Sequence, residues 1–245
     1  MEMKRYEGKV CFVTASTQGI GFAIAERMAQ EGGIVIICSR REKNIKEALD
    51  KLKGYKVEGH ACNIGKKEER VALLKKIDEK YGKIDVLVCN QACSTHFGSQ
   101  LEITETAYDK LWDLNVKSIF FLIKESLELL KKGGKESSIL VVSSVGGKNP
   151  HHTLGVYNMT KAALDNMVIW MAQELMKEDI RVNGLAPGLI MTDFSGVLWK
   201  ENQGVHPKSK GKSEEIGSVA ATICSKDGSF MNGEVYQVHG GFPRL

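Results

Sequence analysis

Tyr157 and Lys161 stand four residues apart at the start of a helical pattern, so both side chains are expected on one face of a helix. Tyr157 is the only one of the six tyrosines that has a lysine at this spacing. A tyrosine that exchanges protons near neutrality needs its pKa lowered from about 10 to about 7, and a neighbouring ammonium provides a comparable free energy of about 4 kcal/mol. We therefore predict an acid/base tyrosine whose pKa Lys161 lowers. The alternative is a surface pair in a lysine-rich chain.

Ser144 follows a strand-like run and precedes this pair. Its hydroxyl could donate a hydrogen bond to a carbonyl oxygen and stabilise negative charge that develops there. The three residue types together predict proton transfer to or from the oxygen of a carbonyl or alcohol.

A second polar turn lies near the start of the chain, where residues 10–21 read VCFVTASTQGIG. A strand, a small polar turn and the start of a helix form a phosphate site, because the free N–H groups and the dipole of the helix favour an anion. Gly19 and Gly21 are expected to let the chain approach that phosphate closely. Ala15 stands where a further glycine is common, and we expect its φ to be negative.

Ser39, Arg40 and Arg41 follow the second strand-like run. A carboxylate at this place would bind the ribose hydroxyls of NAD, whereas a guanidinium suits a 2′-phosphate. NADP(H) is therefore the predicted cofactor, and the alternative is that the arginines only begin a solvated helix.

Apolar runs alternate with longer helical patterns along the whole chain, which predicts a single α/β domain over residues 1–245 with a doubly wound, parallel, seven-stranded sheet. The expected strands are Val10–Thr14, Ile34–Cys38, Val57–Cys62, Val86–Cys89, Ile139–Ser143, Arg181–Ala186 and Val235–Val238. The expected helices are Ile20–Gln30, Ile45–Lys53, Lys66–Tyr81, Tyr108–Lys131, Val156–Lys177 and Glu214–Cys224.

Residues 193–212 interrupt this alternation, since they combine several glycines with an apolar patch of Phe194, Val197, Leu198 and Trp199. A segment of this kind after a strand predicts a lid over a ligand pocket. The alternative is a surface loop. Further candidates for the pocket wall are His96, Phe97, His151 and His152.

The bulk properties argue against nucleic-acid and membrane partners. The net charge of +4 is too small to indicate nucleic-acid binding, and no run is long enough to span a membrane. No signal peptide or Cys-x-x-Cys is present, so a cytoplasmic, reduced protein is expected. His151 and His152 are expected to point in different directions, and no metal site is predicted.

With these motifs in order, the chain resembles the short-chain dehydrogenase/reductase family over nearly its full length. Thr14 to Gly21 is similar to the glycine loop of the family, and Ser144 precedes Tyr157 by the thirteen residues typical of it. The other matching motifs are Asn90-Gln91-Ala92-Cys93, Leu114-Asn115-Val116 and Pro187-Gly188 with Ile190 and Thr192.

The resemblance implies roles for individual residues. Tyr157 would be the general acid in reduction, Lys161 would lower its pKa and hold the nicotinamide ribose, Ser144 would orient the carbonyl, and Asn115 would anchor a relay water. The cofactor-binding residues that it implies are Ala15, Ser16, Thr17, Gly19, Ile20, Gly21, Ser39, Arg40, Asn63, Ile64, Asn90, Ala92, Tyr157, Lys161, Pro187, Gly188, Ile190 and Thr192.

Three stretches, VTASTQGIGFAIA, SRREKNIKEAL and NGLAPGLIMTDFSGVLW, are similar to the NADP-dependent carbonyl and retinal reductases of the dehydrogenase/reductase member 4 subgroup. The expected function is reduction of a ketone, aldehyde, quinone or retinal-like carbonyl. The alternatives are a 3-oxoacyl-acyl-carrier-protein reductase, for which Lys208–Lys212 would supply a basic patch, and a non-catalytic NADP-binding regulator.

The resemblance also implies a homotetramer assembled through the two long helices. Relatives of the subgroup end in a peroxisomal Ser-Arg-Leu, and this chain ends in Pro243-Arg244-Leu245, so a peroxisomal location is the alternative to the cytoplasm.

Overall fold

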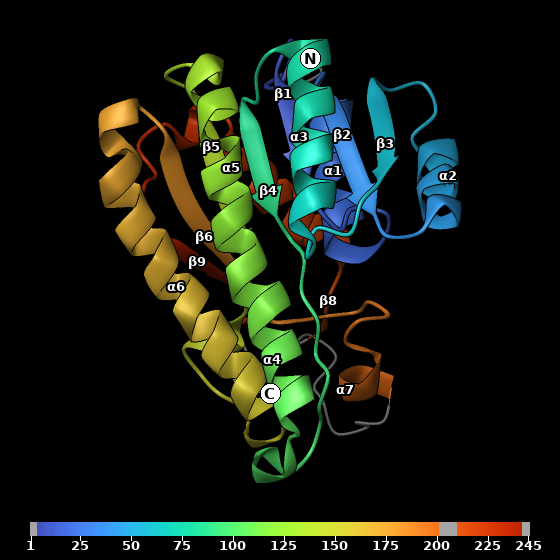
Figure 1. Cartoon of the computed structure of the whole chain (residues 1–245), viewed down its shortest axis with the longest axis vertical. Helices are drawn as coiled ribbons and strands as arrows, with labels where there is room; N and C mark the ends of the chain where they lie inside the picture. Colours follow the sequence, from blue (N-terminus) through green and yellow to red (C-terminus); the bar gives the residue numbers. More distant parts are fainter. Residues whose placement is uncertain (1–3, 201–209, 242–245) are drawn as a thin grey trace.

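Seven parallel strands run through the middle of the molecule in the order β3-β2-β1-β4-β5-β6-β9 (Figure 1). The computed structural model describes residues 4–200 and 210–241. The three central strands are fully buried, because helices cover both faces of the sheet. The strands are β1 (Val10–Val13), β2 (Ile34–Ser39), β3 (Val57–Ala61), β4 (Val86–Cys89), β5 (Ser138–Val142), β6 (Arg181–Pro187) and β9 (Val235–Val238).

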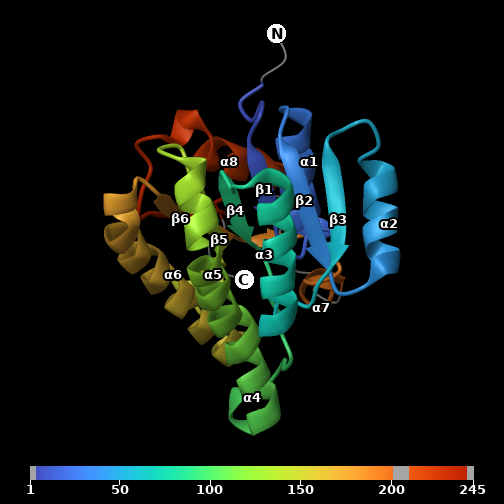
Figure 2. The same ribbon diagram turned by 45° about the horizontal axis from the view of Figure 1, so that its top comes forward.

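Two helical layers enclose this sheet, as Figures 1 and 2 show from two directions. On one face, α1 and α8 pack on the sheet and on each other, with α2 at the edge. On the other face, α3, α5 and α6 form the second apolar core. The helices are α1 (Gly19–Gln30), α2 (Glu42–Lys51), α3 (Lys67–Tyr81), α4 (Glu105–Trp112), α5 (Ser118–Gly133), α6 (Gly155–Leu175), α7 (Gly196–Lys200) and α8 (Ser213–Cys224). The predicted doubly wound sheet is confirmed.

Four of the predicted helices match the observed bounds to within two residues, and the other two begin three residues earlier than predicted. The long helix expected over Tyr108–Lys131 begins earlier, where Thr104 caps α4 by accepting a hydrogen bond from the N–H of Ala107. It is also interrupted by a π-helical turn, Asp113–Lys117, at which the Asn115 side chain is drawn into the protein. Helix α2 begins three residues before the expected Ile45. The sequence pattern did not show this first turn, because Glu42 to Asn44 are polar and carry no apolar period.

The predicted lid region, 193–212, begins shortly after β7 (Leu189–Ile190) and includes β8 (Lys210–Gly211), which pairs with β7 in a short parallel ribbon. Within it, α7 forms a five-residue helix. The side chain of Trp199, the first two residues of Lys208–Lys212 and the tripeptide Pro243-Arg244-Leu245 lie outside the described residues. No helix in the described residues is long and apolar enough to cross a bilayer.

Candidate active site

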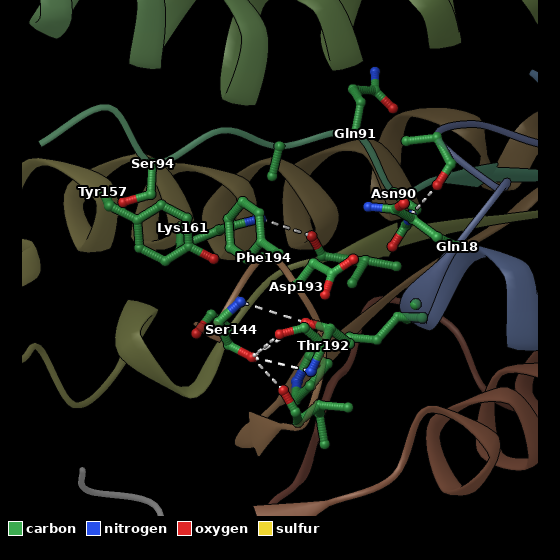
Figure 3. Close-up of a pocket in the computed structure, with 18 of the residues that line it drawn as sticks. Gln18, Asn90, Gln91, Ser94, Ser144, Tyr157, Lys161, Thr192, Asp193 and Phe194 are labelled. Atoms are coloured by element: carbon green, nitrogen blue, oxygen red, sulfur yellow. Dashed lines mark hydrogen bonds between the residues drawn. The ribbon is translucent and has the colours of Figure 1, made fainter. Parts of the chain in front are cut away.

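A cleft of about 1040 Å³ opens at the carboxyl ends of the strands. It lies where the chain reverses its winding, between β1 and β4, which is the ligand-binding place of open α/β sheets. Ser144, Tyr157 and Lys161 lie towards one end in Figure 3, Gln18 and Asn90 towards the other, and Asp193 and Phe194 between them. The predicted residues that line the cleft are Ala15, Thr17, Gly19, Ile20, Ser39, Arg40, Asn63, Ile64, Asn90, Ala92, Ser144, Tyr157, Lys161, Pro187, Gly188, Ile190 and Thr192.

Two of the predicted cofactor residues, Ser16 and Gly21, lie behind the cleft wall. The hydroxyl of Ser16 is fully buried, donates to the carbonyl of Val13 at 2.6 Å and accepts from the N–H of Cys38 at 3.2 Å. A Cβ on Gly21 would come within 2.4 Å of the Asn90 side chain. Both residues therefore hold the glycine loop against neighbouring strand ends, and their predicted contact with a cofactor stays a prediction.

Asn115 is also fully buried and lies off the cleft. Its Oδ1 accepts from the N–H of Cys93 at 2.8 Å, and its Nδ2 donates to the Cys93 carbonyl at 3.0 Å and to Thr160 Oγ1 at 3.2 Å. These bonds connect the π-helical turn to the loop after β4 and to α6, so the amide is fully engaged. The water-anchoring role implied for Asn115 stays a prediction.

The N-terminus of α1 opens into the cleft through Gly19 and Ile20. No side chain of the described residues caps this helix, and its first turn holds no acidic residue. The free N–H groups and the positive dipole end therefore suit the phosphates of a dinucleotide, and Gly19 takes a positive φ of 58° at the turn. These residues fit a nicotinamide dinucleotide.

The expectation of a negative φ at Ala15 is wrong, because the residue has a φ of 48°. In this left-handed region the Cβ of an L-residue crowds its own backbone. The loop holds Ala15 there, since the Asn90 side chain donates at 3.1 Å to its carbonyl and Ser16 is bonded to Val13. Ala15 therefore carries backbone strain that a glycine would not.

We predict that Ala15→Gly stabilises the protein by about 0.5–1 kcal/mol, because relief of the left-handed strain exceeds the extra chain entropy of glycine. Urea unfolding measures this. The control is Ala48→Gly, within α2 and 1% exposed, which should destabilise the protein by about 1 kcal/mol or more. A destabilised Ala15→Gly variant would contradict the strain argument.

The far end of the cleft is basic. Ser39, Arg40 and Arg41 line it, and neither arginine forms an ion pair with a described residue. Asp193 is the one acidic residue among the described lining residues, and it belongs to the segment after β7. A phosphate at this end would meet two guanidinium groups and no adjacent carboxylate.

Tyr157 and Lys161 are brought together on α6 as predicted, but the electrostatic expectation is wrong. The ammonium of Lys161 lies over the face of the Tyr157 ring, 5.5 Å from its centroid, and donates to the Val142 carbonyl at 2.9 Å. Burial raises the pKa of Tyr157, and a hydrogen bond from Ser144 acts in the opposite direction. Burial also lowers the pKa of Lys161 to about 8. The Tyr157 hydroxyl is therefore protonated at neutral pH, which suits a proton donor.

Ser144 is held at the end of β5 by a short turn. Its Oγ accepts from the N–H of Gly146 at 3.1 Å and caps the 3₁₀ turn Val145–Gly147. A Cβ on Gly146 would meet Asn158 Oδ1 at 2.3 Å, so glycine lets this turn lie against α6. The hydroxyl is thereby kept on the same side of the cleft as Tyr157.

Apolar side chains form the mouth of the cleft beside Tyr157. The Phe194 ring lies 6.2 Å from the ring of Tyr157, and both line the cleft. Of the predicted wall candidates, Phe97 and His151 line the cleft, whereas His96 and His152 do not. Further lining residues were not predicted from the sequence, among them Asn44, Ser94, Asn149, Leu154, Asn158 and Met191. Most of them lie within three residues of a predicted motif, and this closeness in the sequence was the signal that could have identified them.

The expected divergence of His151 and His152 is wrong, since their ring centroids are 4.5 Å apart. Among the described residues no group of three or more His, Cys, Asp or Glu side chains could hold a metal ion.

Comparisons with known proteins find relatives that match nearly the whole chain. A family model described as Enoyl-(Acyl carrier protein) reductase matches residues 14–243. Dehydrogenase/reductase SDR family member 4 of Bos taurus is 41% identical over 245 residues, which covers 96% of this chain and 87% of the relative. Tropinone reductase-like 3 of Erythroxylum coca is 39% identical, covering 98% of this chain and 95% of the relative.

Two solved structures are similar along almost the whole chain. One is a 3-ketoacyl-(acyl-carrier-protein) reductase from Brucella melitensis complexed with NADH, with a TM-score of 0.90, 26% identity and coverage of 96% and 98% of the two chains. The other is a 7α-hydroxysteroid dehydrogenase complexed with NADH and 7-oxo glycochenodeoxycholic acid, with a TM-score of 0.88, 26% identity and coverage of 97% and 96%.

Proposed function

The chain belongs to the short-chain dehydrogenase/reductase family, and from that premise we propose that it is an NADPH-dependent carbonyl reductase. Membership makes it an oxidoreductase that uses a nicotinamide cofactor. The observation that carries the proposal is the placement of Tyr157, Ser144 and Lys161 in one cleft with the uncapped N-terminus of α1.

Bound NADPH supplies the hydride for the carbonyl carbon. Tyr157 donates its hydroxyl proton to the carbonyl oxygen, and the Ser144 hydroxyl donates a hydrogen bond to the same oxygen. The Lys161 ammonium, held on the Tyr157 ring by the Val142 carbonyl, stabilises the phenolate that remains. Asn115 acts in this proposal by fixing the Cys93 loop and α6, because its side chain is engaged there.

The cleft supports an apolar substrate, since several aromatic and aliphatic side chains line it, among them Phe194 beside Tyr157, and Phe97 and Phe194 are about half exposed. A ketone, aldehyde, quinone or retinal-like carbonyl on an apolar body matches this surface. The apolar lining residues include Phe97, Leu154, Met191, Phe194, Val197 and Leu198.

A 3-oxoacyl-acyl-carrier-protein reductase is the second candidate, favoured by the similarity to the Brucella melitensis structure. A non-catalytic NADP-binding regulator is disfavoured, because Ser144, Tyr157 and Lys161 all line one cleft. These candidate functions are tested by assaying a panel of carbonyl compounds with NADPH and with NADH. The panel contains apolar ketones, diketones, quinones, retinal and an acetoacetyl thioester. Turnover of the thioester alone would favour the second candidate. No turnover of any compound would reject both enzymes.

Arg40→Ala is predicted to raise the KM for NADPH about 10-fold or more and to leave the KM for NADH nearly unchanged. The guanidinium is expected to pair with the 2′-phosphate, which NADH lacks. Lys43→Ala removes the same charge from α2 at an exposed position outside the cleft lining, so it controls for long-range electrostatics. Equal effects of Arg40→Ala on both cofactors would show that Arg40 does not read the 2′-phosphate.

A homotetramer is part of the proposal. Phe121 on α5 and Ile169 and Trp170 on α6 are exposed by 37%, 47% and 50%, which is an unusual apolar surface for two neighbouring helices. Sedimentation equilibrium of the wild type and of Trp170→Glu tests this interface, and a monomeric wild type would reject it.

A cytoplasmic location remains a proposal that a fluorescent fusion tests, with and without the last three residues.

A further inference from the structure

Asp165 is a buried carboxylate behind the proposed catalytic groups. It lies on α6, one turn beyond Lys161, and is 8% exposed. Its Oδ1 accepts from the Ser143 hydroxyl at 2.5 Å, whereas its buried Oδ2 has no hydrogen-bond partner among the described residues. A buried carboxylate with an unfilled acceptor destabilises a fold unless something compensates it. The roles proposed above do not use this group.

The contacts of Asp165 join the two segments that carry the site. Ser143 also donates to the Lys161 carbonyl at 3.2 Å, and Ser144 follows it directly. A Cβ on Gly147 would come within 2.7 Å of Asp165 Oδ2, so the turn after Ser144 rests on the carboxylate. The Ser143–Asp165 link therefore fixes the end of β5 against α6, and with it Ser144 against Tyr157.

The charge of Asp165 acts on Lys161. The two do not meet in an ion pair, since the ammonium is bonded to the Val142 carbonyl. The carboxylate nevertheless raises the pKa of Lys161 and partly offsets the larger, opposite effect of burial. The other titratable groups around the pair are Tyr157, Cys93 on the loop after β4, and Lys148 beyond the turn.

We propose that Asp165 is a positioning residue that aligns Ser144 with Tyr157 through Ser143 and places a carboxylate one helical turn from Lys161. The inference rests on the proposed carbonyl reduction. It assigns a function to a buried charge that stability alone does not explain.

Asp165→Asn tests the charge, because the amide keeps the shape and can still accept from Ser143. Lys161 should then lose its proton at lower pH. We expect the alkaline limb of kcat/KM to move to lower pH by about one pH unit. At a pH above that limb, kcat/KM should then be about tenfold lower than in the wild type, and on the acidic plateau it should change little. The unfolding temperature should be unchanged or higher, since a buried charge is removed. Asp50→Asn, exposed on α2, is the matched control.

Ser143→Ala tests the link. It leaves the carboxylate in place and should lower kcat at every pH without moving the alkaline limb. A parallel pH profile for Asp165→Asn and the wild type would overturn the proposal, and so would a uniform loss with a lower unfolding temperature.

A direct readout separates this inference from the proposed function. The pH dependence of Lys161 modification by an amine-reactive probe, followed by mass spectrometry, should give a lower pKa for Lys161 in Asp165→Asn than in the wild type. If the wild type reduces no carbonyl, the proposed function fails, and this comparison still decides whether Asp165 controls Lys161. An unchanged Lys161 pKa would reject the inference.

Discussion

Tyr157→Phe is expected to lower kcat/KM for carbonyl reduction by about 10²–10⁴-fold and to leave the Kd for NADPH nearly unchanged. The change deletes only the hydroxyl that donates the proton. Phenylalanine can keep both ring contacts, with Lys161 and with Phe194. Steady-state kinetics with a reactive diketone measure the first effect, and NADPH fluorescence titration measures the second.

Tyr55→Phe is the matched control, because Tyr55 is 44% exposed and lies outside the cleft lining. It should behave as the wild type. Undiminished turnover in Tyr157→Phe would remove the proton donor from the mechanism, and loss of NADPH binding would show that the hydroxyl serves cofactor binding instead.

Lys161→Met is the second large expected effect, a fall in kcat of about 10²-fold or more. Without the ammonium, the phenolate left on Tyr157 would lose the positive charge that lies over its ring. The substitution should preserve folding, because a buried charge gives way to an apolar side chain of similar length. Thermal unfolding and kcat at several pH values measure the two effects.

The pH dependence of this pair has a definite sign. Lys161 is charged below its lowered pKa of about 8, so wild-type activity should fall as the pH rises through that value. Lys161→Met should lack this limb. Lys124→Met is the control, since Lys124 also lies over an aromatic ring, 6.0 Å from the Phe121 centroid, outside the cleft lining. A wild-type profile with no alkaline limb would show that Lys161 does not titrate during turnover.

The sequence predicted the sheet well because most of its strands, β1, β2, β4 and β5 above all, read as short apolar runs between polar turns. Val86–Cys89 and Val235–Val238 have the predicted bounds. The predicted helix bounds were wrong where side chains contact distant residues. One example is the π-helical turn, where the Asn115 side chain forms hydrogen bonds with Cys93 and Thr160.

The sequence predicted most of the residues that form the site, but only part of how they act. Tyr157 and Lys161 share a helix face by their spacing, so no tertiary information was needed to pair them. Ser16, Gly21 and Asn115 belong to recognisable motifs, and yet they support the cleft from behind. A motif identifies which residues matter, but it does not say whether a side chain points to the ligand or into the protein.

By itself the sequence therefore determined the order of elements, the glycine loop, the basic turn after β2 and the pairing of Tyr157 with Lys161, because these depend on local spacing. Only the tertiary structure decided the positive φ of Ala15, the raised pKa of Tyr157 and the place of Asp165 behind Ser143 and Lys161. Backbone strain and desolvation are set by atoms that distant segments bring together, and no local pattern records them.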